Sequence, residues 1–255
     1  MIMCERLLSN PNLPENKVKK VIIAPGNKKL EQSLNDLGIE TITITRRTNV
    51  RQEIRHHSDL YFCQLDSKNV VVSSQQGNLI KKLQEDNICN NIIVEEKVLT
   101  KDYPGDVLLN CAFFDKYVIY NDKTVSDKIN AYINGSDLTK ICIKQGYTKC
   151  SVSIVSNNAI LTDDEFISKK VIGYGIDALL IKKGYVKLKG FEYGFIGGCC
   201  GKIDKNTLAF NGDITKHPEY IMIKQFLNKH GVNDLSLHNG ELEDIGSIIP
   251  LTEES

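Results

Sequence analysis

The chain has 255 residues, of which 41% are hydrophobic and 25% charged, and its 32 basic residues balance its 32 acidic residues. These fractions exclude disordered, collagen-like and coiled-coil proteins, and a net charge of zero gives no general attraction to nucleic acid or anionic lipid. No apolar run approaches the roughly 18 residues of a membrane span, and the N-terminal segment has no secretory signal. We therefore predict a soluble, cytoplasmic protein without a membrane partner, and we do not expect nucleic acid as a ligand.

Apolar strand-like runs alternate with amphipathic helical stretches along the whole chain. The first pass predicts a strand, a helix and a strand at residues 18–26, 27–38 and 39–46. Each later pass predicts two strands, a helix and a strand. These four passes span residues 59–98, 106–146, 149–184 and 197–240. A single strand at 244–252 remains at the end.

The passes recur with a period of roughly 45 residues, which is typical of arrays and propellers. The first pass lacks a leading strand, and the last strand lacks a partner, so the last strand is expected to complete the first pass and leave no sheet edge open. We predict one α/β domain over residues 1–255, a propeller of five strand-strand-helix-strand units closed by the C-terminal strand. The alternative is a doubly wound parallel sheet, which explains the α/β alternation but neither the strand pairs nor the missing phosphate-binding glycine turn.

The eight cysteines predict neither disulfides nor a zinc site. Most of them lie in apolar strand-like runs, where cysteine behaves as a small hydrophobe, and the cytoplasm keeps it reduced. No C-x-x-C pair occurs, and the histidines have no ligand spacing around the cysteines. We expect no metal and no organic cofactor.

Equivalent positions of the five units should meet at one end of a central channel, because the first strand of each unit lines it. Thiols, carboxylates, an imidazole and an ammonium gather there, and such a set can bind a guanidinium through its acids and attack its carbon with a thiolate. The predicted catalytic residues are Cys199, Cys150 and His57. The predicted substrate-binding residues are Asp59, Asp106, Asn110, Lys149, Asp244 and Ser247.

Five such units resemble the pentein fold of the guanidino-group-modifying enzyme superfamily. The segments that carry a closer resemblance, to an uncharacterised bacterial branch of that fold, are HHSDLYFCQL, YPGDVLLN, KQGYTKCS, GFIGGCCGKI and LEDIGSIIPL. The resemblance implies a hydrolase or transferase that acts on a small cationic guanidino or amidino compound without a cofactor. The superfamily also contains a non-catalytic ribosome anti-association factor.

The catalytic set of that superfamily combines a late cysteine, a histidine from an earlier unit and carboxylates that grip the guanidinium. In this chain the segment IGSIIPLT places Ile249 or Pro250 near the position of the late cysteine, and no cysteine follows Cys200. The family's His-x-Asp motif occurs at residues 57–59, in an early unit. Either the machinery has moved to other units, or the protein is a non-catalytic binder, associated with a ribosome or protein partner or sensing a small molecule.

Several of these residues also have purely structural interpretations. His57 and Asp59 are typical of a turn cap, Asp106 follows the turn sequence Tyr-Pro-Gly, and Cys150 is typical of a buried structural thiol. The glycines around Cys199 and Cys200 indicate a tight turn and close backbone approach. The lysine- and aromatic-rich stretch 181–195 resembles either a nucleic-acid contact or an exposed strand whose lysines prevent edge pairing.

Overall fold

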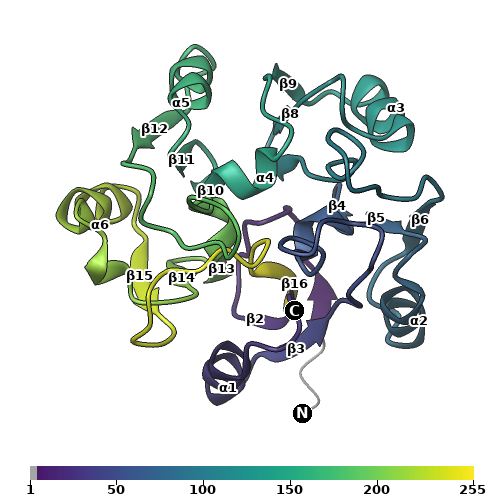
Figure 1. Ribbon diagram of the computed structural model, residues 1–255, viewed down its shortest axis with the longest axis horizontal. Coiled ribbons are helices and arrows are strands. Elements are labelled where there is room, and N and C mark those ends of the chain that lie inside the picture. Colours follow the sequence, from purple (N-terminus) through teal and green to yellow (C-terminus); the bar gives the residue numbers. More distant parts are fainter. Residues whose placement is uncertain (1–4) are drawn as a thin grey trace.

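The computed structural model describes residues 5–255, so residues 1–4, including Cys4 and that end of the predicted domain, lie outside the described residues. Within residues 5–255 the strands form five sheets around a common centre, with the longer helices at the periphery (Figure 1). This arrangement confirms the predicted fold class, an α/β propeller of five units. None of the helices in this range has the length and hydropathy that a bilayer span requires.

Each unit contains a first strand antiparallel to a second strand, an outer helix, and a third strand parallel to the second. The second unit contains β4 (Phe62–Gln64), β5 (Asn69–Ser73), α2 (Gly77–Glu85) and β6 (Asn91–Glu95). The third contains β7 (Ala112–Phe114), β8 (Tyr117–Tyr120), α3 (Asp127–Gly135) and β9 (Thr139–Cys142). The fourth contains β10 (Val152–Ser156), β11 (Ala159–Thr162), α5 (Glu165–Ile172) and β12 (Asp177–Leu180). The fifth contains β13 (Cys200–Asp204), β14 (Thr207–Phe210), η3 (Ile214–Lys216), α6 (Tyr220–Lys229) and β15 (Asn233–Ser236).

The first unit joins the two ends of the described chain. Its elements are β16 (Ile249–Glu254), β2 (Val18–Ile23), α1 (Lys28–Asp36) and β3 (Glu40–Thr43). The strand β16 pairs with β2 in the register Ile249 to Ile22, so the late strand closes the ring as the sequence pattern predicts. A short strand that the sequence did not predict, β1 (Glu5–Leu7), pairs with the other edge of β16.

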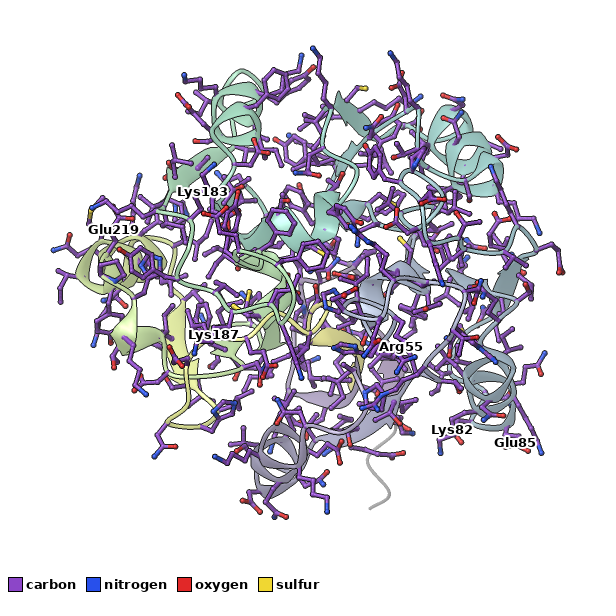
Figure 2. The ribbon with its side chains drawn as sticks, in the orientation of Figure 1. Arg55, Lys82, Glu85, Lys183, Lys187 and Glu219 are labelled. Carbon is purple, nitrogen blue, oxygen red and sulfur yellow. The ribbon has the colours of Figure 1, made fainter. Side chains whose placement is uncertain are left out.

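The outer helices are amphipathic and bury one narrow face. Each of the five longer helices in the described part of the chain buries two apolar residues spaced four apart, which lie on the same side of a helix. These pairs are Leu30 and Leu34, Leu79 and Leu83, Ile129 and Ile133, Ile167 and Val171, and Ile223 and Leu227. Charged ends such as those of Lys82 and Glu85 on α2 point away from the sheets (Figure 2). The helices therefore cover the sheets from outside.

Short helical turns replace the beginning of three expected strands. They are η1 (Ser58–Leu60) before β4, α4 (Thr148–Ser151) before β10 and η2 (Gly197–Cys199) before β13. Residues 106–111, also expected as strand, form a succession of turns before β7. In α4, the hydroxyl of Thr148 donates to the Gln145 carbonyl at 2.7 Å and that of Ser151 to the Tyr147 carbonyl at 2.8 Å. Such local side-chain bonds stabilise turns at the expense of extended strands.

The residues that precede each first strand meet near the centre of the ring, and we call them the approach segments. They comprise residues 57–61, 106–111, 147–151, 196–199 and 244–248. The amide of Asp59 donates to the carbonyl of Gly246 at 3.1 Å, and that of Ser247 donates to the carbonyl of Gly198 at 2.8 Å. These bonds join units distant in the sequence and bring the predicted site residues into one region.

Candidate active site

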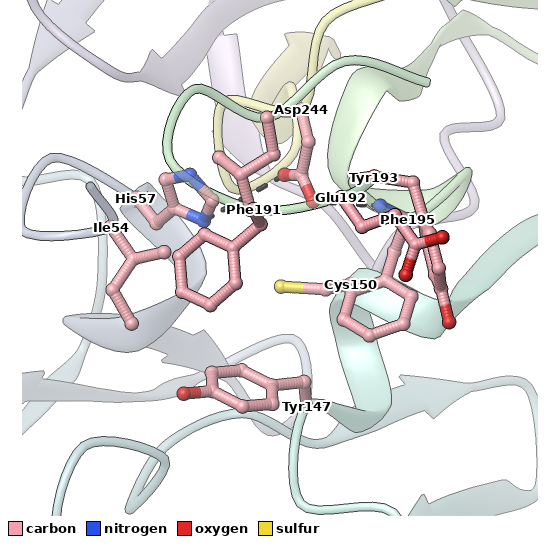
Figure 3. Close-up of a pocket in the computed structure, with 10 residues that line it drawn as sticks. Ile54, His57, Tyr147, Cys150, Phe191, Glu192, Tyr193, Phe195 and Asp244 are labelled. Carbon is pink, nitrogen blue, oxygen red and sulfur yellow. Dashed lines mark hydrogen bonds and ion pairs between the residues drawn. The ribbon is translucent and has the colours of Figure 1, made fainter. Parts of the chain in front are cut away.

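A pocket of about 290 Å³ lies between the approach segments and the loop that connects β12 to β13. Its floor is polar, whereas its walls are mainly aromatic and aliphatic (Figure 3). The residues that line it are Ile54, His57, Tyr147, Cys150, Leu188, Phe191, Glu192, Tyr193, Phe195 and Asp244.

Cys150, His57 and Asp244 form a cluster of titratable side chains in this pocket. The sulfur of Cys150, a ring nitrogen of His57 and a carboxylate oxygen of Asp244 all lie within 4.8 Å of one another. Nδ1 of His57 is 3.7 Å from Oδ1 of Asp244, and all three side chains are almost completely buried. A thiol, an imidazole and a carboxylate in such a group are chemically able to serve as nucleophile, proton carrier and acid.

Asp59 connects the thiol of Cys150 to a buried polar chain. The thiol donates to Oδ2 of Asp59 at 3.0 Å, and the hydroxyl of Ser247 lies 2.9 Å from the same oxygen. The ammonium of Lys149 donates to the hydroxyl of Ser247 at 3.0 Å. The Asp59 side chain therefore bonds to Cys150 and Ser247. The sequence also allowed Asp59 to cap the turn before β4, and its side chain does not do so.

Asn110 fixes the beginning of α4. Its Oδ1 accepts from the amides of Lys149 at 2.7 Å and Cys150 at 3.4 Å. Its Nδ2 lies 3.4 Å from the sulfur of Cys150. Asn110 therefore orients Cys150 from the side opposite the pocket, and it does not line the pocket itself.

Asp244 is held by the backbone of two segments. Its Oδ1 accepts from the amide of Gly246 at 3.0 Å and its Oδ2 from that of Phe195 at 2.9 Å. A Cβ at Gly198 would lie 2.0 Å from Oδ1 of Asp244. Close backbone approach at the glycines before Cys199 is thus what admits this carboxylate to the site.

The low polarity of the site controls the protonation of its groups. Burial raises the pKa of Asp244 to about 6 and lowers the pKa of His57 to about 4. Burial, together with the charges of Asp59 and Asp244, raises the pKa of Cys150 well above its ordinary value, and burial also raises the pKa of Asp59. Near neutral pH the site therefore holds a neutral imidazole, a protonated thiol and a negative Asp244.

A family model matches residues 22–249 of the chain. The chain belongs to DUF6873, a family of unknown function. No curated protein matches the sequence.

This DUF6873 chain is similar in fold to several solved structures at 10% sequence identity. An agmatine deiminase from C. jejuni has a TM-score of 0.55, with 95% of each chain covered. The amidinotransferase SxtG from Microseira wollei has a TM-score of 0.54, with 90% of this chain and 91% of that chain covered. A dimethylarginine dimethylaminohydrolase from Pseudomonas aeruginosa with citrulline has a TM-score of 0.54, with 86% and 92% covered. These similarities confirm the expected pentein fold.

The two predicted nucleophile candidates of this DUF6873 chain lie in different surroundings. Cys150 lines the pocket, whereas Cys199 is completely buried in an apolar cluster and its thiol donates to the Ile196 carbonyl at 3.2 Å. The neighbouring Cys200 contacts the hydroxyl of Ser153 at 3.0 Å. Neither Cys199 nor Cys200 lines the pocket, so the geometry favours Cys150.

The predicted substrate-binding residues divide into three groups by position. Only Asp244 lines the pocket. Asp59, Asn110, Lys149 and Ser247 lie beneath Cys150 in the polar chain described above. Asp106 is buried behind the pocket wall, where it accepts a hydrogen bond from the hydroxyl of Tyr147.

Sequence reasoning missed the aromatic walls. Tyr147, Phe191, Tyr193 and Phe195 line the pocket, although the stretch 181–195 was interpreted as an exposed strand or a nucleic-acid contact. The signal that was present is the alternation of Phe191, Tyr193 and Phe195, with Gly194 among them. Alternating aromatics in a glycine-containing loop fit a pocket wall as well as they fit a strand.

The Cys150, His57 and Asp244 side chains are also of the types that bind zinc. Their donor atoms, all within 4.8 Å of one another, form a group that could hold an ion. The absence of a metal from the working protein therefore stays a prediction, and chelation tests it below.

Proposed function

We propose that the protein hydrolyses a guanidino or amidino compound, with Cys150 as the nucleophile. The observation that carries the proposal is the position of Cys150, whose thiol faces the pocket, donates to Asp59 at 3.0 Å and lies within 4.8 Å of His57 and Asp244. The similar folds of an agmatine deiminase and an amidinotransferase support the choice of substrate class.

Binding of a cation prepares the nucleophile. A guanidinium in the pocket faces Asp244, and its positive charge offsets the negative charge of Asp59 and Asp244 around the thiol. A nearby positive charge stabilises a thiolate and lowers the pKa of its thiol. The thiol of Cys150 can therefore give up its proton when substrate is present and keeps it otherwise.

The first half of the reaction forms a bond between carbon and sulfur. The thiol proton passes to Oδ2 of Asp59 while the sulfur attacks the central carbon of the guanidinium, which gives a neutral tetrahedral species. The bond from carbon to one nitrogen then breaks, and Asp59 returns the proton to that nitrogen. Ammonia or an amine leaves, and a cationic thiouronium remains on Cys150.

The second half releases the enzyme. His57 is a neutral imidazole because burial lowers its pKa to about 4, so it can accept a proton from water as the water oxygen attacks the carbon. The bond from carbon to sulfur breaks, and the new hydroxyl proton passes to the sulfur. The products are a ureido compound from a guanidine or an amide from an amidine, the free thiol and a proton on His57. The released ammonia or amine takes up that proton and leaves as an ammonium.

The test compares two cysteine variants. Purified protein is incubated with a panel of guanidino and amidino compounds, and ammonium and ureido products are measured. The wild type and Cys199→Ser should form product, whereas Cys150→Ser should form none and should not trap the thiouronium adduct in mass spectrometry. Equal turnover by Cys150→Ser and wild type would overturn the proposal.

A second candidate function is a small-molecule sensor that binds the cation without reacting. The observation that favours it is the burial of the Cys150 thiol beside Asp59 and Asp244, which raises the pKa of the thiol well above its ordinary value. This candidate predicts saturable binding of a guanidinium, neither product nor adduct, and unchanged affinity in Cys150→Ser. A ribosome or protein partner stays a prediction.

A further inference from the structure

The pocket walls have a chemistry distinct from that of the floor. Tyr147, Phe191, Tyr193 and Phe195 surround the entrance to Cys150 (Figure 3). The ring centres of Tyr147 and Phe195 are 6.3 Å apart, and those of Tyr193 and Phe195 are 6.4 Å apart. Ring faces exposed to a pocket attract cations and apolar groups.

Every formal charge at the pocket surface is negative. The lining contains Asp244 and Glu192 but neither lysine nor arginine, and His57 is neutral because burial lowers its pKa to about 4. Glu192 is exposed in the loop between β12 and β13. Within the described residues that line the pocket, an anionic group would find no cation to pair with.

Three cations close to lining residues are engaged elsewhere. The ammonium of Lys183 lies 5.7 Å from the ring centre of Tyr193, and Lys183 is not among the lining residues. The guanidinium carbon of Arg51 lies 5.3 Å from the ring centre of Phe191, and Arg51 is not among the lining residues. The ammonium of Lys149 donates to Ser247, and this lysine lines a separate small cavity next to Asp59. Placing a carboxylate in the pocket would thus cost its hydration without a compensating ion pair.

Building on the proposed function, we infer that the substrate is a guanidinium or amidinium whose tail is apolar and carries no acid group. The cationic end lies on the floor next to Cys150 and Asp244, and the tail packs between the aromatic walls. A donor at the far end of the tail can interact with Glu192 at the mouth. Free guanidino acids are disfavoured, because their carboxylate would meet ring faces and Glu192.

The test uses two ligands that differ mainly in the acid, n-butylguanidine and γ-guanidinobutyrate. Their affinities are measured by titration calorimetry on the wild type and on Cys150→Ser, which removes turnover. We expect n-butylguanidine to bind about tenfold more tightly or better, equivalent to about 1.4 kcal/mol. Glu192→Lys should reduce or reverse this preference, whereas the control Glu241→Lys should keep it, since Glu241 is exposed and lies outside the pocket.

Equal affinities, tighter binding of γ-guanidinobutyrate, or no binding of either ligand would overturn the inference. If γ-guanidinobutyrate binds more tightly and Arg51→Ala abolishes that preference, Arg51 is the anchor for an acid. Product formation is measured separately on the wild type. Preferential binding of n-butylguanidine without product in the whole panel would sustain this inference while rejecting the proposed hydrolysis.

Discussion

The sulfur of Cys150 lies 3.0 Å from Oδ2 of Asp59, a residue 91 positions earlier in the chain. Burial raises the pKa of both groups. An aspartate with a raised pKa is a stronger base than an exposed one, so it is suited to take the proton of a thiol that does not ionise by itself. In the proposed mechanism, this contact makes Asp59 the first proton acceptor and leaves His57 free to accept a proton from the attacking water.

Asp59→Asn removes this proton acceptor while preserving size. We expect kcat/KM to fall by about 100-fold or more, because no carboxylate hydrogen-bonded to the thiol is then left to accept its proton. A suitable control is Asp66→Asn, because Asp66 is bonded to Tyr132 and Asn69 away from the pocket. Unchanged activity of Asp59→Asn would show that another group accepts the proton.

Lys149→Met removes the buried positive charge that lowers the pKa of both Asp59 and Asp244. Their pKa values should rise, so the acid limb of the profile of kcat/KM against pH should move to higher pH. Lys202→Met provides the matched control, since Lys202 is also buried but donates to the carbonyl of Val155. If Lys149→Met is folded by circular dichroism and its profile of kcat/KM against pH does not move, then Lys149 does not set the pKa values of Asp59 and Asp244.

Asp244→Asn should change how stability depends on pH. The pKa of Asp244 rises from 3.8 to about 6 in the folded state, so its contribution to stability is present below pH 3.8 and is lost as pH rises through about 6. The amide has no such loss. Relative to the wild type, the free energy of unfolding of the variant should therefore increase between pH 4 and pH 8, by at most about 3 kcal/mol. Urea titrations at several pH values measure this difference, and a difference that stays constant with pH would refute the expectation.

Gly198→Ala should damage both packing and activity. The added Cβ would lie 2.0 Å from Oδ1 of Asp244, and overpacking a buried site costs about 1–3 kcal/mol. Gly77→Ala is the matched control, because its Cβ would have no neighbour within 4 Å and it begins α2; it should be neutral or stabilise by up to about 1 kcal/mol. Thermal unfolding and activity of the two variants, measured side by side, check both expectations.

Chelation separates thiol chemistry from metal chemistry. The expected mechanism uses no metal, so dialysis against EDTA should leave kcat/KM unchanged, and elemental analysis of the purified protein should find no stoichiometric zinc. Loss of activity on dialysis with recovery on addition of zinc would instead assign Cys150, His57 and Asp244 as ligands.

The order of helices and strands could be predicted, because the spacing of hydrophobic residues differs between a helix with one buried face and a strand. The buried pairs Leu30 with Leu34 and Leu79 with Leu83 indicate helices that cover sheets, and an unpartnered last strand indicates closure. The strand β1 could not be predicted, because it has only three residues and forms through pairing with β16, which lies at the other end of the chain. The turn α4 was expected as a strand, because Cys150 and the residues after it form an apolar run in which helix and strand cannot be distinguished by pattern.

The sequence could predict which residues lie near the centre of the ring, but it could not predict which of the cysteines there faces the pocket. Cys150 and Cys199 both precede a first strand, and nothing in the spacing distinguishes them. Packing makes the distinction, since η2 buries Cys199 in an apolar cluster whereas α4 turns Cys150 toward the pocket. The aromatic walls belong to a loop without periodicity, so their position depends on tertiary contacts such as the bond from Phe195 to Asp244.

The strand that closes the ring also has a kinetic consequence. Asp244 and Ser247 immediately precede β16, which pairs with β2 more than 200 positions earlier. During synthesis, the thiol of Cys150 meets its complete set of partners only after residues 244–254 have been added. The surroundings of this thiol are thereby completed in the same step that adds β16 to the sheet of the first unit, so a nascent chain has no complete pocket until its ring is closed.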